Sequence, residues 1–159
     1  MTRRGFRPRA LGEIAIRTRN IDAMIAFYRD VLGLQILSRR DDRGIVFFRL
    51  ADGFAGHTAV LALFDEPEGE VTAGQGSSLH HLALTLPRAE QDAAQGWLDR
   101  QAMPYRVETF PWIGWRGVFL TDPDGNTVEL VAYEASLLDD SSLTELSVIK
   151  PALDLHQPE

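Results

Sequence analysis

Residues 13–34, EIAIRTRNIDAMIAFYRDVLGL, combine a strand pattern with a helix pattern that follows it directly. In the first part, Ile14 and Ile16 alternate with polar or small residues, which is typical of a strand with one buried face. In the second part, apolar residues recur at helical spacing between Asn20, a potential N-cap, and Gly33, which is placed to end a helix. This stretch therefore predicts a strand followed by an amphipathic helix.

The same plan returns in the second half of the chain. Residues 81–87, HLALTLP, alternate in the same way, and three leucines share one face: Leu82, Leu84 and Leu86. His81 then occupies the position that Glu13 holds in the first half. A second helix is predicted from Pro87 to about Met103, with a weaker apolar stripe formed by Ala89, Ala93 and Trp97. Self-similarity of this kind indicates two copies of one structural module.

Each predicted helix is followed by three predicted strands. They span residues 34–38, 44–50 and 58–64 in the first half, and residues 105–109, 117–121 and 127–133 in the second. Before the last strand, DPDG at residues 122–125 has the Asp, Pro and Gly that a type I turn favours, and it predicts a tight hairpin. The corresponding connection, residues 51–57, lacks this signal, so we expect it to be looser.

Alignment of the two closing strands places Glu129 at the position of Ala62. The spacing supports this alignment, since Glu13 and Ala62 are 49 residues apart and His81 and Glu129 are 48 apart. Each half thus has two corresponding positions, one at the start of its first strand and one in its last strand.

Composition narrows the class of protein. The chain has 159 residues, of which 45% are hydrophobic, no cysteine, and a formal net charge of -7. These values predict a folded globular chain that binds a small molecule, with no attraction to nucleic acid or to a membrane surface. Any bound metal needs nitrogen and oxygen ligands because thiolates are absent. We find no secretory signal and no apolar run of about 18 residues, which predicts a cytoplasmic protein.

The repeat also predicts the domain organisation. We expect a basic arm at residues 1–10, a first module at 11–64, a linker at 65–78, a second module at 79–134 and a tail at 135–159. In the tail, apolar residues at helical spacing predict one further helix: Leu137, Leu138, Leu143 and Leu146.

The quoted stretches at 13–34 and 81–87, with RGVFLTDPDGNTVELV at 116–131, resemble the vicinal oxygen chelate superfamily. This is the family of glyoxalases, bleomycin-resistance proteins and extradiol dioxygenases. The resemblance implies an α+β fold in which two tandem βαβββ modules form a cupped mixed sheet. It also implies a homodimer and a small-molecule substrate.

The resemblance implies a divalent metal site on equivalent positions of the two modules. Glu13, His81 and Glu129 are then the metal ligands, whereas Ala62 departs from the family pattern at the fourth position. Such a ligand set suits Mn, Fe, Co, Ni or Zn and does not select among them. Either carboxylate, Glu13 or Glu129, is also a candidate catalytic base if it leaves the ion.

The residues also allow non-metal interpretations. Glu13 can pair with Arg17 on the same strand face, and His81 can be a structural histidine. Glu129 is harder to explain in this way, because it interrupts an apolar strand and a buried, unpaired carboxylate is costly. His80 is expected to point to the opposite, helix-packed face.

Three further side chains are candidates for substrate binding. The guanidinium of Arg17 suits an anionic group, and the indoles of Trp112 and Trp115 suit an aromatic one. The alternatives stay open: Arg17 in an ion pair with Glu13, and a tryptophan loop that anchors itself to the core.

Together these features predict a metal-dependent enzyme that acts on a small oxygenated substrate by isomerisation, elimination or addition. Ring cleavage by an extradiol dioxygenase is a less favoured alternative, because Glu13 stands where that branch has a histidine. A metal-free protein that sequesters a flat molecule, as bleomycin-resistance proteins do, is the other alternative.

Overall fold

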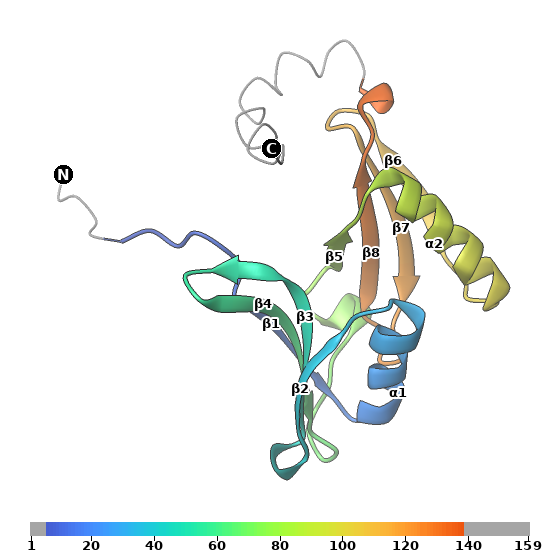
Figure 1. Cartoon of the computed structure of the whole chain (residues 1–159). Coiled ribbons are helices and arrows are strands. Elements are labelled where there is room, and N and C mark those ends of the chain that lie inside the picture. Colours follow the sequence, from blue (N-terminus) through green and yellow to red (C-terminus); the bar gives the residue numbers. More distant parts are fainter. Residues whose placement is uncertain (1–5, 139–159) are drawn as a thin grey trace. The chain divides into compact units, whose positions relative to one another are not determined.

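The computed structural model describes residues 6–138, which form two compact units (Figure 1). Unit 1 contains the residues up to Ser77 together with Asp122–Gly125, and unit 2 contains Ser78–Thr121 and the residues from Asn126 onward. The predicted tail helix lies largely outside the described residues. Within residues 6–138, no helix has the length and apolar character needed to cross a membrane.

Unit 1 is built on a four-stranded mixed sheet. Its strands are β1 (Glu13–Thr18), β2 (Ile36–Arg40), β3 (Ile45–Phe54) and β4 (His57–Asp65), in the order β1-β4-β3-β2. β1 and β4 are parallel, and the other pairs are antiparallel. This order places the two strands with corresponding candidate positions, β1 and β4, side by side.

The helical segment of unit 1 covers the predicted residues, but only its first part is α-helical. α1 (Ile21–Ala26) continues into one π-helical turn (Phe27–Val31), and Gly33 then ends the segment with a φ of 73°. Asn20 makes no side-chain cap; its backbone N–H instead donates to Oγ1 of Thr18. Residues 6–138 also contain three short 3-10 turns: Asp41–Arg43, Gly74–Gly76 and Ala135–Leu137.

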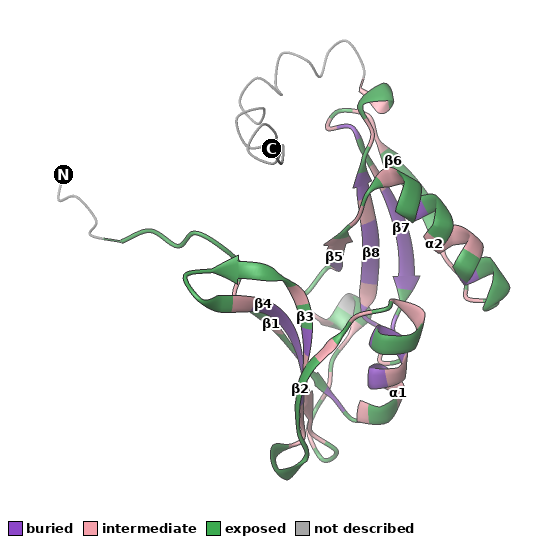
Figure 2. Ribbon diagram, viewed as in Figure 1, coloured by how far each residue is buried: buried purple, intermediate pink, exposed green. Residues whose placement is uncertain are grey.

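The core of unit 1 lies between α1 with its π turn and one face of the sheet, where Met24, Tyr28, Phe48 and Leu61 are fully buried (Figure 2). The Tyr28 hydroxyl donates a 2.9 Å hydrogen bond to Oδ2 of Asp122. Burial, reinforced by Asp122, raises the pKa of this hydroxyl, which therefore stays protonated. The turn at Asp122–Gly125 thus packs in unit 1, although its flanking strands belong to unit 2.

The hairpin between β3 and β4 is tight, so the predicted loose connection is wrong. Phe54 pairs with His57, and only Ala55 and Gly56 lie between them, both with positive φ. Gly53, with a φ of 75°, is also required, because a Cβ there would overlap the backbone carbonyl of His57.

Unit 2 repeats the architecture of unit 1. Its strands are β5 (Leu82–Thr85), β6 (Arg106–Phe110), β7 (Trp115–Thr121) and β8 (Thr127–Tyr133), in the order β5-β8-β7-β6. The predicted hairpin between β7 and β8 is confirmed: the backbone N–H of Gly125 donates to the Asp122 carbonyl, 2.9 Å away. The α+β fold of two βαβββ modules is thereby confirmed, one module in each unit.

The helix of unit 2, α2 (Arg88–Arg100), packs on the sheet with a different face from the one predicted. Ala89, Ala93 and Trp97 are exposed, whereas Gln91 and Leu98 are buried. The Gln91 amide nitrogen donates to the backbone carbonyls of Arg116 and Leu130, each 2.7 Å away. These hydrogen bonds satisfy a buried amide and tie α2 to β7 and β8.

Strand register supports the alignment of the two halves. Ala15 is opposite Ala62 in unit 1, and Ala83 is opposite Glu129 in unit 2. Counting two residues back from Ala15 and Ala83 gives Glu13 and His81, so these two occupy equivalent positions.

Candidate functional site

Unit 2 contains a cavity of about 310 Å³ on the sheet face opposite α2. Side chains from β6, β7 and β8 and from the segments next to them line it: His80, His81, Arg106, Glu108, Phe110, Trp112, Ile113, Trp115, Phe119 and Glu129. A volume of this size is at the lower end of the range for small-molecule pockets.

His81 and Glu129 meet in this cavity, and Nε2 of His81 lies 3.1 Å from Oε2 of Glu129. The Glu129 side chain is only 6% exposed, whereas the His81 side chain is 33% exposed. Glu129 enters from β8, opposite Phe119 of β7, and the His81 ring stands edge-on to Phe119 at 6.0 Å. A carboxylate and an imidazole thus share one largely apolar end of the cavity.

Burial governs the electrostatics of Glu129. Desolvation raises the pKa of its carboxyl group, and the nearby His81 and Arg106 oppose that shift only in part. A buried carboxylate whose negative charge is only partly compensated by nearby cationic groups binds a cation or accepts a proton readily.

Gly117 makes room for Glu129, although the sequence patterns do not single it out as a site residue. A Cβ at this position would overlap Oε1 of Glu129 and lie 2.6 Å from Cε2 of Phe119. A glycine inside a strand often marks such a close approach, so the sequence does carry a signal for this role.

The prediction for His80 is wrong, because His80 lines the same cavity as His81. Nδ1 of His80 lies 2.7 Å from Nδ1 of His81, and the two rings are edge-to-face at 5.0 Å. Both residues precede β5, which begins at Leu82, so the alternation of a regular strand does not apply to them.

Trp112 and Trp115 line the cavity and are not anchored by burial, although only Trp112 lies in the predicted loop, because β7 begins at Trp115. Trp112 is 59% exposed and Trp115 is 42% exposed, which contradicts a purely core-anchoring role. Phe110 contacts the Trp112 ring at 5.3 Å and the Phe119 ring at 6.3 Å, so aromatic surface runs from the loop to the buried end. The guanidinium of Arg106 covers the Phe119 ring at 4.1 Å and is paired with Glu108.

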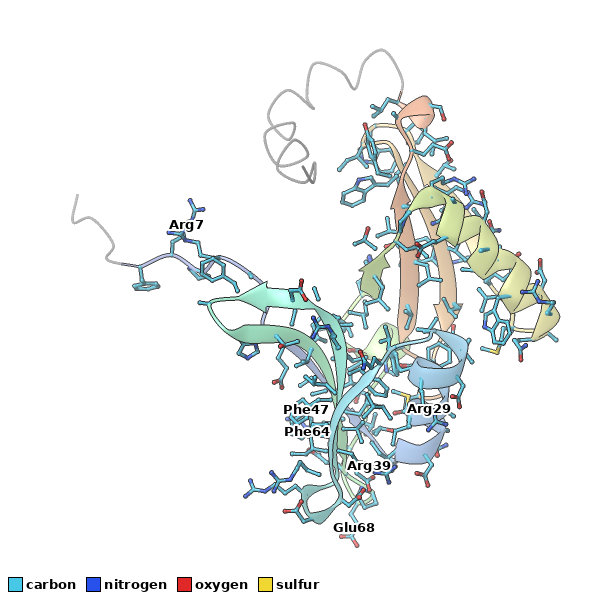
Figure 3. The ribbon with its side chains drawn as sticks, viewed as in Figure 1. Arg7, Arg29, Arg39, Phe47, Phe64 and Glu68 are labelled. Carbon is cyan, nitrogen blue, oxygen red and sulfur yellow. The ribbon has the colours of Figure 1, made fainter. Side chains whose placement is uncertain are left out.

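The remaining candidates, Glu13 and Arg17, belong to unit 1. Glu13 lines a second cavity, of about 400 Å³, together with Arg40 and His57. The alternative in which Arg17 pairs with Glu13 is wrong: Nε of Arg17 lies 3.0 Å from Oε1 of Glu66. In Figure 3, Phe47 and Phe64 mark the sheet face away from α1, which is also the face of Glu13.

The donor chemistry of the unit 2 pair fits a divalent metal ion. Adjacent ligand atoms about 2.1 Å from one ion lie roughly 3.0 Å apart at octahedral angles and about 3.4 Å apart at tetrahedral angles, and the 3.1 Å between His81 Nε2 and Glu129 Oε2 falls in this range. Within residues 6–138, no group of three or more His, Asp or Glu side chains is gathered closely enough to hold an ion. The structure therefore brings together two of the three predicted ligands.

The fold and this site define a protein of paired βαβββ modules with an imidazole–carboxylate centre. A model of the Glyoxalase/Bleomycin resistance protein/Dioxygenase superfamily matches residues 10–130. The chain belongs to this superfamily, as its motifs predict. A search of curated proteins found no match.

Several solved structures are similar to this chain over most of their own length. The lactoylglutathione lyase of Agrobacterium tumefaciens is 26% identical, with a TM-score of 0.59 over 79% of this chain and 94% of that one. A glyoxalase/dioxygenase from Nostoc punctiforme is 22% identical, with a TM-score of 0.66 over 84% of this chain and 99% of that one. The oxidase ChaP-H2 is 18% identical, with a TM-score of 0.59 over 77% of this chain and 91% of that one. The last two similarities show the shared fold alone.

Proposed function

We propose that the protein is a divalent-metal-dependent enzyme that acts on a small oxygenated substrate by isomerisation, elimination or addition. The observation that carries this proposal is the contact between His81 and Glu129 in an aromatic cavity. A buried carboxylate next to an imidazole is costly unless a cation or a proton compensates it.

We assign three metal ligands: His81, Glu129 and Glu13. Position along the chain supports the choice of Glu13, which lies two residues before Ala15 just as His81 lies two residues before Ala83, and these two alanines hold matching register positions. Ala62 has no donor atom and leaves a coordination position to substrate or water. Two carboxylates and one imidazole suit Mn, Fe, Co, Ni or Zn.

The residues around the pair have distinct roles in this proposal. A bound ion supplies Lewis-acid stabilisation of a developing enolate or oxyanion. If Glu129 leaves the ion, its carboxylate accepts or returns a proton, because burial raises the pKa of this group. Glu13 is the second candidate base. Phe119 excludes water from the buried end of the cavity.

Trp112 and Trp115 are the proposed substrate contacts, since their exposed indoles line the cavity that holds the pair. Arg17 already has a carboxylate partner in Glu66, so an anionic substrate group would have to displace Glu66 to reach it. The proposal therefore depends on the tryptophans and not on Arg17.

A second candidate function is metal-free binding of a flat molecule, as in bleomycin-resistance proteins. The observation that favours it is the extent of aromatic surface in the cavity, which continues from Trp112 through Phe110 to Phe119. Metal content separates the two candidates, because only the enzyme needs His81 and Glu129 as ligands.

The test is the metal content of the full chain, purified without chelator and then reloaded separately with Mn²⁺, Fe²⁺, Co²⁺, Ni²⁺ and Zn²⁺. We expect about one ion per chain in the wild type and none in His81→Ala or Glu129→Gln. Glu90→Gln, an exposed carboxylate on α2 outside the cavity, is the control and should bind like the wild type. Full metal content in both site variants would overturn the proposal.

A further inference from the structure

His80 and His81 form a direct contact between two ring nitrogens. The 2.7 Å separation of their Nδ1 atoms is a hydrogen-bond distance. A hydrogen bond between two nitrogens needs one proton, so one ring donates and the other accepts. A neutral imidazole can do either, depending on its tautomer.

The other nitrogen of His81 sets the direction of this bond. Nε2 of His81 lies 3.1 Å from Oε2 of Glu129, a distance at which the tautomer with its proton on Nε2 donates a hydrogen bond to the carboxylate when no cation is bound. Nδ1 of His81 is then unprotonated and accepts a hydrogen bond from Nδ1–H of His80.

A cation on Nε2 of His81 requires the opposite direction. Nε2 must then offer its lone pair, so Nδ1 of His81 has to carry the proton and donate it to Nδ1 of His80. The protons balance: His81 loses the proton on Nε2 to water and gains one on Nδ1 from His80. His80, which is exposed, takes up a proton from water on its own Nε2.

We infer that His80 is a positioning residue: its Nδ1 holds the His81 ring in both tautomers, and the Nδ1–Nδ1 hydrogen bond reverses when a cation binds. This inference rests on the proposed metal-dependent function. A backbone carbonyl in the same place could only accept, and would favour the metal-bound tautomer alone. A second histidine serves both states of the site.

The test separates the hydrogen bond from simple ring packing. His80→Phe keeps an aromatic ring against His81 and removes the nitrogen, whereas His80→Asn keeps a polar atom that can donate or accept at the place of Nδ1. Ser78→Ala, an exposed position two residues away, is the matched control. All variants are made in the full chain.

The first readout is the affinity for Zn²⁺ and Co²⁺, measured by competition with a chelator. We expect His80→Phe to weaken binding by roughly 10–100-fold, the usual effect of losing a partner that orients a ligand. His80→Asn should recover most of this loss, and Ser78→Ala should bind like the wild type. Equal affinity in His80→Phe and the wild type would overturn the inference while leaving the proposed function intact.

The second readout is the tautomer of His81, observed by ¹⁵N NMR of the imidazole nitrogens. We expect the proton on Nε2 in the metal-free wild type and on Nδ1 after addition of Zn²⁺. The same tautomer in both states would overturn the reversal. A wild-type chain that binds no ion at all would defeat the proposed function itself, and this inference with it.

Discussion

Gly117 lies diagonally across the paired strands β7 and β8 from Glu129, and a Cβ atom at Gly117 would overlap the Glu129 carboxylate. The same atom would crowd the ring of Phe119. The charged group and the apolar ring at the buried end of the cavity therefore occupy the space that glycine leaves free. The absence of a side chain at Gly117 therefore allows the Glu129 carboxylate to keep its contact with His81.

Gly117→Ala should displace Glu129 and weaken Zn²⁺ binding by roughly 10–100-fold. Overpacking at this buried position should also lower the free energy of unfolding by about 1–3 kcal/mol. Chelator competition and urea denaturation measure the two effects. Gly96→Ala is the control, because its added methyl group meets only the end of the Arg100 side chain, at 3.5 Å. This helical change should raise stability by about 0.5–1 kcal/mol. Unchanged zinc affinity in Gly117→Ala would contradict the role of Gly117.

Glu129→Gln should make the metal-free protein more stable at neutral pH while abolishing metal binding. Burial raises the pKa of the Glu129 carboxyl group above its ordinary value of 4.5, so the folded state holds this proton more tightly than the unfolded state. Its contribution to stability is complete below pH 4.5 and is lost as the pH rises through the higher, folded-state pKa. Urea denaturation of wild type and variant across this pH range measures the difference. If the free energies of unfolding of the two proteins changed with pH in the same way, burial of the Glu129 carboxylate would not cost stability, and the prediction would be wrong.

Tyr28→Phe should destabilise the protein by about 1–3 kcal/mol, because it removes a hydrogen-bond donor from a buried carboxylate. The lost bond is the 2.9 Å contact with Asp122, which connects the helical segment of unit 1 to the turn after β7. Thermal or urea unfolding gives the magnitude. Tyr133→Phe removes a hydroxyl from a tyrosine that is 42% exposed, and it should change stability by less than about 0.5 kcal/mol. Similar effects of the two substitutions would argue against a special role for the buried pair.

Trp112→Ala should weaken the binding of an aromatic probe and leave stability nearly unchanged. The indole is 59% exposed, so little core packing is lost, but it forms an aromatic edge of the cavity. An aromatic pair contributes about 0.5–1.5 kcal/mol, which corresponds to a roughly 2–10-fold loss of affinity. Titration with catechol, with and without Zn²⁺, is the measurement. Trp97→Ala on α2, outside the cavity, is the control. Equal catechol affinity in both variants would exclude Trp112 as a substrate contact.

Most of the fold follows from the sequence, because local patterns carry that information. The alternation in β1, the positive φ at Gly33 and the turn at 122–125 all depend on residues close together in the chain. The equivalence of Glu13 and His81 is also visible, since repeated modules preserve spacing, and the two residues lie two positions before Ala15 and Ala83, which hold matching register positions. For this reason, the repeat identifies the equivalent positions, and the resemblance to the superfamily makes them candidate ligands.

Sequence patterns misjudge features that depend on contacts between distant segments. The apolar pattern of α2 favours its alanines as the packing face, yet Gln91 faces the sheet because two backbone carbonyls of β7 and β8 accept its hydrogen bonds. The pairing of Arg17 with Glu66 follows from the position of the chain after β4, not from the neighbouring Glu13. Polarity along one element does not reveal a partner supplied by another.

The sequence by itself thus determined two βαβββ modules, their matching positions and a histidine and two carboxylates as candidate ligands. Only the tertiary structure decided that His80 turns towards His81 and that Gly117 makes room for Glu129. The physical reason is the same in both cases. Alternation predicts where a side chain points only inside a regular strand, and the space left by a glycine has meaning only once the neighbouring strand is in place.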